Sequence, residues 1–134
     1  MRLVFVLFTS AYLFAQCDDV ELSTREAKHL SEVVFQGTIE AFTGSVTERT
    51  VMFRVSRVWK GRVGPTFEMP AIQTDGGMCT AFWRGLLAVG NELVVYASRR
   101  FIPGGKEYLP LRSKSTLASR AKDISALGRA HKPE

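Results

Sequence analysis

Apolar and polar residues alternate in several stretches of the chain, and this two-residue period predicts an all-β fold. Five stretches are expected to form strands: residues 33–41, 51–59, 66–70, 93–98 and 107–111. In the first strand, Gly37 indicates a bulge or a sharp bend. In the second strand the alternation slips by one residue at Arg57–Trp59, as it does where a curved strand contains an extra residue. Coiled and bulged strands of this kind favour a small barrel.

Two segments show helical spacing instead. Ser23 and Glu26 form the Ser-x-x-Glu pattern in which each side chain binds a backbone N–H group of the other at a helix start. Apolar residues follow at three- to four-residue intervals, so we expect a short helix over residues 24–31. A second apolar stripe predicts a C-terminal helix that ends at Gly128, and its members are Leu117, Ala121, Ile124 and Leu127. Residues 129–134 are expected to be a frayed polar tail.

The expected fold class is all-β: a five-stranded OB-like (oligonucleotide/oligosaccharide-binding) Greek-key barrel with a short N-terminal helix and a C-terminal helix packed on it. An antiparallel sandwich is the alternative. A chain of 134 residues fits one core, whereas two cores would each be marginal. Because aromatic and β-branched residues are plentiful, wholesale disorder is excluded.

The N-terminus has the pattern of a secretory signal, with Met1–Arg2 followed by a mostly apolar run that ends at Ala15. This run is shorter than the roughly 18–20 residues of a bilayer span, so residues 1–16 are expected to be a cleaved signal peptide. A buried strand or a short anchor is the alternative. Cleavage leaves either Gln16 or Cys17 as the first residue of a protein that is secreted, to the extracellular space or the periplasm. No other stretch is apolar enough to cross a membrane.

Export changes the interpretation of the two cysteines, Cys17 and Cys79. In an oxidising compartment we expect them to form one disulfide. This bond would close a loop of about sixty residues and stabilise the fold by roughly 4 kcal/mol through chain entropy. Two independent thiols, one buried and one exposed, are the alternative.

The residue types favour binding over catalysis. His29 and His131 lie in no Ser, Cys or Asp arrangement that a nucleophilic mechanism needs. The sequence has no HExxH, CxxC or P-loop pattern, so no catalytic residue, intrinsic metal or cofactor is expected. The formal charge is 18 − 13 = +5, and the basic residues are dispersed. Secretion and this modest charge argue against a nucleic-acid partner. The same basic residues could instead bind an anionic glycan or an envelope surface.

Several blocks of sequence occur in a recognisable order. They are Cys17 after the signal, VFQG at 34–37, FRVSRVWKG at 53–61, GGMC at 76–79, VGNELVVYA at 89–97 and ISALG at 124–128. Together they resemble the netrin-like module of the tissue inhibitors of metalloproteinases, especially its bacterial secreted relatives. The resemblance covers residues 17–128, which we take as the folded domain. It implies an OB barrel with flanking helices, in agreement with the strand pattern.

The resemblance also implies a mechanism. In these inhibitors the first mature cysteine lies over the catalytic zinc of a protease, and its α-amino group and carbonyl oxygen chelate the metal. Its side chain is tied by a disulfide to the cysteine of the Gly-rich turn. The matching positions here are Cys17 and Cys79, and Asp18 would enter the specificity pocket of the protease.

This chain departs from the family pattern at three points. It reads Cys17-Asp18-Asp19 where relatives have Cys-x-Cys, and the partner of that second cysteine is also missing near Arg112. We hypothesise that Asp19 and Arg112 form an ion pair where the family has this second disulfide. Asp18 would bring a carboxylate into an apolar pocket, which costs several kcal/mol unless it is paired. Finally, a mature chain that starts at Gln16 would lack the chelating amine.

We therefore expect a secreted, single-domain, non-catalytic module that binds another protein as a monomer. A zinc metalloprotease is the specific partner that the resemblance suggests. Trp59, Phe82 and Trp83 are expected to pack in the core or at a barrel end. If Trp83 is exposed with Arg84 beside Cys79, the two are candidate partner contacts, because aromatic and arginine residues dominate interface energies. The rival interpretation is an extracellular or envelope adhesion protein, or an OB-fold protein that binds an anionic ligand without inhibiting a protease.

Overall fold

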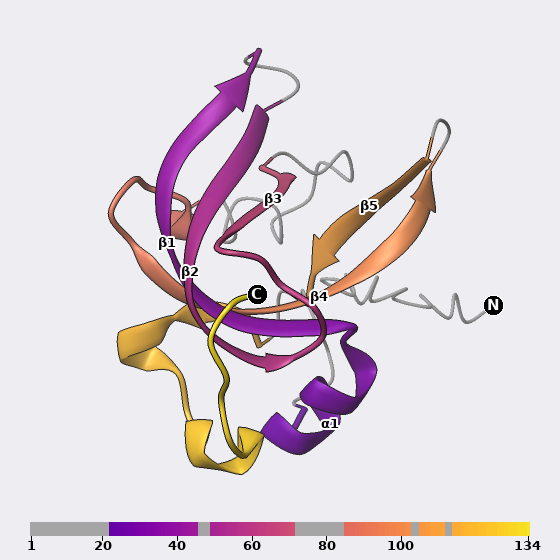
Figure 1. Cartoon of the computed structure of the whole chain (residues 1–134), viewed down its shortest axis with the longest axis vertical. Helices are drawn as coiled ribbons and strands as arrows, with labels where there is room; N and C mark the ends of the chain where they lie inside the picture. Colours follow the sequence, from indigo (N-terminus) through magenta and orange to yellow (C-terminus); the bar gives the residue numbers. More distant parts are fainter. Residues whose placement is uncertain (1–21, 46–48, 72–84, 103–104, 112–113) are drawn as a thin grey trace, which may run out of the picture.

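One antiparallel β-sheet makes up most of the structure (Figure 1). The structure is a computed structural model that describes residues 22–45, 49–71, 85–102, 105–111 and 114–134. Its strands are β1 (Val33–Gly44), β2 (Arg49–Lys60), β3 (Thr66–Pro70), β4 (Glu92–Ile102), β5 (Gly105–Pro110) and β6 (Thr116–Leu117). They lie in the order β3-β2-β1-β4-β5, and β6 pairs with β4. Helix α1 (Thr24–Leu30) precedes the sheet, as its sequence predicts, and no helix in the described ranges is long and apolar enough to cross a membrane.

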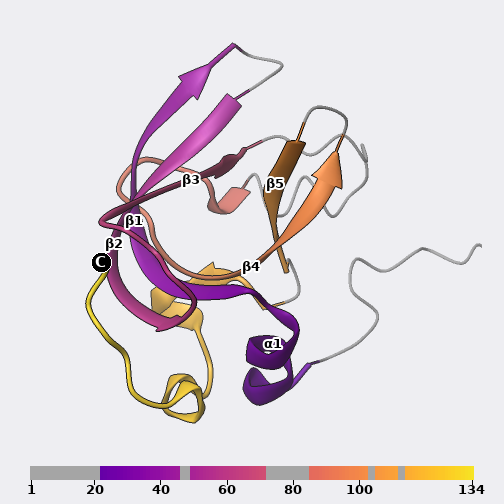
Figure 2. The ribbon, with the colours of Figure 1, turned by 45° about the vertical axis from the view of Figure 1, so that its right-hand side comes forward.

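The sheet curls so strongly that its two outer strands approach each other (Figure 2). The aromatic rings of Phe67 on β3 and Tyr108 on β5 lie 4.9 Å apart between centroids. All five expected strands are present, and most extend beyond the predicted bounds. The described residues therefore form a mostly β half-barrel with little helix, and their strands belong to one curled sheet, in contrast to the alternative of two packed sheets.

Strand β2 contains the extra residues that allow it to curve. Val34 pairs with Lys60 but Phe35 pairs with Val58, so Trp59 has no partner of its own on β1. A second irregularity follows between Gln36 and Gly37. The predicted bulge near Gly37 and the predicted slip at Arg57–Trp59 are both confirmed. Such bulges increase the local twist, which bends the sheet toward a barrel.

The sheet is buried on both faces near the start of β1. One cluster, which we call the inner core, fills the concave side and includes Val33, Phe35 and Phe53. The other, the outer cluster, covers the convex side; its buried members are Ala27, Val34, Trp59, Val94, Tyr96 and Leu127. Because side chains alternate across a strand, Val33 and Val34 enter different cores. Trp59 is 5% exposed, which confirms that it belongs to a core.

The predicted C-terminal helix is wrong. The structure has two short 3₁₀ segments instead, η1 (Ala118–Arg120) and η2 (Ile124–Leu127). Between them Ala121 is extended and Asp123 has a left-handed φ of 53°. The carbonyl of Lys122 accepts a hydrogen bond from the Thr24 side chain rather than from a following turn of helix. Ala121, Ile124 and Leu127 still pack on the outer cluster, whereas Leu117 packs against the inner core, so tertiary contacts override the helical spacing.

The expectation of a frayed tail at residues 129–134 is also wrong. His131 and Val58 exchange two backbone hydrogen bonds of 2.8 and 2.9 Å. The N–H group of Glu134 donates to the carbonyl of Val63 at 3.0 Å. His131 therefore pairs with β2 where β3 no longer does, and Glu134 binds the segment that follows β2, so the last residues cover part of an otherwise open strand edge.

Two glycines with positive φ provide a matched test of the turn after β2. A Cβ atom at Gly61 (φ +81°) would lie 2.7 Å from the carbonyl oxygen of Glu32, whereas a Cβ at Gly90 (φ +92°) would meet nothing within 4 Å. We expect Gly90→Ala to lower the free energy of unfolding by about 1–2 kcal/mol because of its backbone conformation alone. Gly61→Ala should lower it further because backbone atoms must shift. Chemical denaturation measures both values, and equal losses would contradict the close approach.

Candidate functional site

The residues that the sequence singles out lie outside the described residues. These are Cys17, Asp18, Cys79, Trp83 and Arg84, together with Asp19 and Arg112 of the hypothetical ion pair. The disulfide, the ion pair and the partner contacts therefore stay predictions. The described chain begins at Leu22, five residues after Cys17, and shows how the segment behind the predicted reactive terminus is held.

The start of α1 is fixed by a cap that the Ser23 side chain supplies. The backbone N–H of Glu26 donates to Ser23 Oγ at 3.1 Å, and the Ser23 hydroxyl donates to Glu26 Oε1 at 3.0 Å. Leu22, directly before this cap, packs against the outer cluster. The Ser23 half of the predicted cap is confirmed, whereas the Glu26 carboxylate binds the Ser23 hydroxyl in place of the predicted bond to the Ser23 backbone N–H. Leu22, next to the cap, anchors the chain to the sheet.

Side chains of α1 attach the helix to the C-terminal segment. Thr24 is 2% exposed, and its hydroxyl donates to the carbonyl of Lys122 at 3.2 Å. At the other end of α1, Lys28 Nζ donates to the carbonyl of Leu127 at 2.6 Å. The ammonium group of Lys60 on β2 donates to the carbonyl of Lys28 at 2.8 Å, which places a cation at the C-terminal end of the helix. The helix is therefore held by the tail segment and by the sheet.

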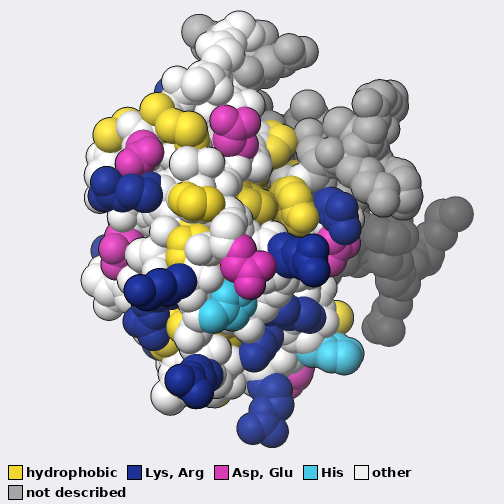
Figure 3. Space-filling model, viewed as in Figure 1, with side chains coloured by type: hydrophobic (Ala, Val, Ile, Leu, Met, Phe, Trp, Pro, Cys, Tyr) yellow, Lys and Arg dark blue, Asp and Glu magenta, His cyan; other side chains and the backbone are white. Residues whose placement is uncertain are grey.

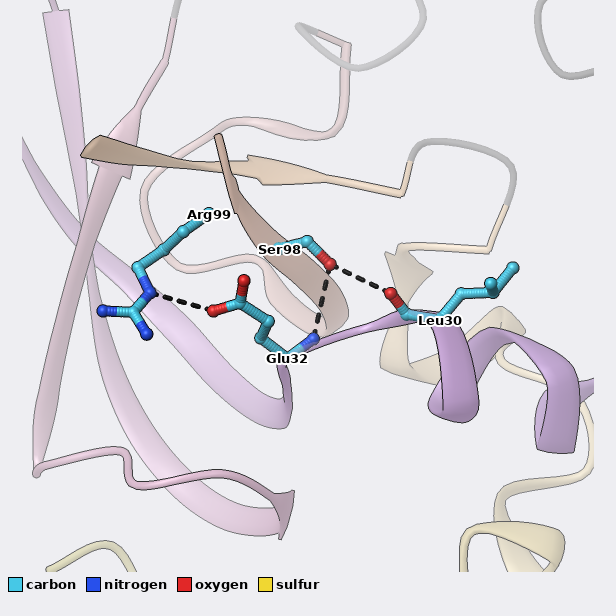
Figure 4. A network of polar contacts seen from close by, with 4 residues as sticks. All are labelled: Leu30, Glu32, Ser98 and Arg99. Atoms are coloured by element: carbon cyan, nitrogen blue, oxygen red, sulfur yellow. Dashed lines mark hydrogen bonds and ion pairs between the residues drawn. The ribbon is translucent and has the colours of Figure 1, made fainter. Parts of the chain in front are cut away.

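A polar network fixes the connection from α1 to β1 (Figure 4). Ser98 on β4 donates to the carbonyl of Leu30 at 3.1 Å and accepts the N–H of Glu32 at 3.3 Å. The Arg99 guanidinium pairs with the Glu32 carboxylate at 2.9 Å. The hydrogen bond to Glu32 raises the pKa of Arg99 above its already high usual value, so the arginine stays charged. Because this pair is exposed, its main effect is on geometry, while Ser98 satisfies backbone groups at the end of the helix.

Tyr96 connects the helix to β4. Its side chain is buried and is hydrogen-bonded with the side chain of Thr24. Burial raises the pKa of the Tyr96 phenol above its usual value of 10.0, and the hydrogen bond with Thr24 offsets this rise only in part. The phenol is therefore neutral at physiological pH and remains able to form hydrogen bonds.

A pocket of about 240 Å³ lies beside Tyr96. Three basic residues line it: Lys114, Arg120 and Lys122. Leu22 and Ala121 contribute apolar surface, and Thr116 contributes a hydroxyl. None of the lining residues that the structure describes is acidic. The ion pairs found among the described residues, Glu40–Arg54 and Glu32–Arg99, use none of the three cations.

Sequence reasoning missed this pocket because it treated the basic residues as dispersed. The available signal was local: residues 114–122 contain three cations and no acidic residue. The spacing alone could not show that these residues meet Tyr96, which lies on a different strand. We call the pocket and its lining residues the basic pocket.

Within the described ranges, no group of three or more His, Cys, Asp and Glu side chains could hold a metal ion. His29 is exposed on α1, and the His131 side chain is exposed while its backbone pairs with β2. Comparison of the chain with protein-family models, curated proteins and solved structures finds no match.

The raised pKa of Tyr96 predicts an alkaline loss of stability. Above about pH 10 the phenol ionises in the unfolded chain while the folded phenol keeps its proton, so unfolding becomes more favourable. Tyr96→Phe should cost about 1 kcal/mol at pH 8, through the lost hydrogen bond with Thr24. It should also reduce the further loss of stability between pH 9 and 11. Urea denaturation across this pH range measures both effects, and an unchanged pH dependence in the variant would contradict the assignment.

Proposed function

We propose that this chain is a secreted, non-catalytic module of the netrin-like type, which docks on another protein through its N-terminal segment. The neighbour relations of the strands support the OB-like barrel in this proposal. Strand β1 lies between β2 and β4, while β3 and β5 approach each other across the open side. An OB barrel has the same order of neighbours and is a partly open Greek-key barrel of five strands.

The observation that carries the proposal is the anchoring of the chain just behind Cys17. Leu22 packs on the outer cluster, Ser23 caps α1, and Thr24 is hydrogen-bonded to the C-terminal segment. A segment that leaves a fixed point keeps less conformational freedom than a free terminus. Less ordering entropy is then lost when the segment docks on a partner.

The proposed specific partner is a zinc endopeptidase. In this mechanism the α-amino group and carbonyl oxygen of Cys17 bind the zinc of the protease, and a disulfide to Cys79 restrains the terminus. The pKa of an α-amino group is ordinarily about 7.7–8.0, and the group must be neutral to bind metal, so inhibition should weaken as pH falls below this range. Asp18 would favour a protease whose specificity pocket contains a cationic side chain, because only a paired carboxylate is tolerated there.

N-terminal sequencing of the secreted protein, followed by inhibition assays against a panel of zinc endopeptidases, tests the proposal. Protein that begins at Cys17 should inhibit at least one member. The same chain with Gln16 retained should inhibit it at least about tenfold less, because the chelating amine is displaced.

Cys79→Ala is the matched control for the disulfide. It removes the proposed disulfide but leaves the amine, so it should weaken inhibition less than retention of Gln16 does. Equal inhibition with and without Gln16, or no inhibition by the Cys17 form, would contradict the chelation mechanism. The second of these results would leave the alternative of an adhesion or anionic-ligand-binding protein.

A further inference from the structure

We propose that the basic pocket binds a small organic anion: one carboxylate or phosphate group carried on a single ring. The inference goes beyond docking through the N-terminus, and it rests on the charge, the shape and the fixed position of the pocket. An acidic sugar is the simplest molecule with this chemistry.

The charged residues found in the described lining of the pocket are all basic. Lys114, Arg120 and Lys122 line it without an acidic neighbour among the described lining residues. Like charges gathered around a concave site repel one another and raise the local concentration of anions. An anionic group placed among them relieves this repulsion, and Arg120 offers the planar fork of donors that suits carboxylates and phosphates. Figure 3 shows that Lys and Arg side chains also gather on the lower part of the molecule, where α1 and the C-terminal segment lie.

The shape of the pocket limits the size of the ligand. Its volume of about 240 Å³ lies just below the roughly 300–1,000 Å³ of pockets that hold drug-sized molecules. One ring with its anionic group fits this space. Leu22 and Ala121 provide apolar surface for the body of a ring, Tyr96 lies in the wall, and Thr116 provides a polar side chain.

The pocket is also fixed before a ligand arrives. Ser115 stands between the lining residues Lys114 and Thr116 and is 1% exposed. Its hydroxyl accepts the backbone N–H of Tyr96 at 3.0 Å and donates to the carbonyl of the same residue at 3.2 Å. On the other wall, the hydrogen bond from Thr24 to the carbonyl of Lys122 holds the segment that carries Arg120 and Lys122. Preorganised walls reduce the entropy that is lost on binding.

Titration of the ¹⁵N-labelled protein with three ligands tests the proposal by nuclear magnetic resonance. The probes are glucuronate, glucose 6-phosphate and glucose, at 0.15 M salt. We expect one or both anions to shift the backbone amides of Leu22, Thr116 and Ala121 in a saturable way, and glucose to shift none of them. The anion with the lower Kd shows whether the pocket prefers a carboxylate or a phosphate group.

The matched variants are Arg120→Gln with Lys122→Gln, and Arg62→Gln outside the pocket. The double variant should raise the Kd of the anion at least about tenfold, and Arg62→Gln should change it less than about twofold. All three side chains are exposed, so both variants are expected to fold, which the dispersion of their amide spectra checks. Binding of glucose as strong as that of the anions, equal weakening by both variants, or no saturable shift would each overturn the proposal.

Discussion

Burial of strand β1 on both faces is the constraint on which the rest of the structure depends. Val33 and Phe35 enter the inner core, while Val34 between them enters the outer cluster. A strand with apolar residues on both faces needs a cover on each side. The curl of the sheet, with its bulges opposite β1, encloses the inner core, and α1 with the C-terminal segment covers the outer cluster.

The cover on the outer face determines where the functional groups lie. Leu22 and Ala27 on one side, and Ile124 and Leu127 on the other, pack on the same cluster. Packing brings the start of the described chain next to residues about a hundred positions later, where Thr24 can bind Lys122. The anchor behind the predicted reactive terminus and the basic pocket are both consequences of this one packing event. Both functional proposals therefore depend on the outer cluster, although they use different atoms.

The elements that depend on local pattern could be predicted from the sequence. The two-residue period gave the strands, Gly37 and the slip at Arg57–Trp59 gave the bulges, and Ser23 with Glu26 gave the start of α1. The C-terminal segment could not be predicted because its apolar spacing fits a helix equally well. Only the hydrogen bond to the Lys122 carbonyl and the left-handed backbone of Asp123 show that this segment forms two short 3₁₀ segments and not one helix. The basic pocket combines Leu22, Tyr96 and residues 114–122, so no local pattern reveals it, while Cys17 and Cys79 stay predictions of the sequence alone.

Native-state hydrogen exchange of the α1 amides tests the central claim that the outer cluster holds the helix on the sheet. Leu127 is fully buried in this cluster, whereas Leu30 at the end of α1 is 60% exposed. Leu127→Ala should lower the free energy of opening of α1 by about 2–5 kcal/mol, because it removes buried contacts and leaves a cavity. Leu30→Ala should change it by less than about 0.5 kcal/mol. Undiminished protection of α1 in Leu127→Ala would contradict the account.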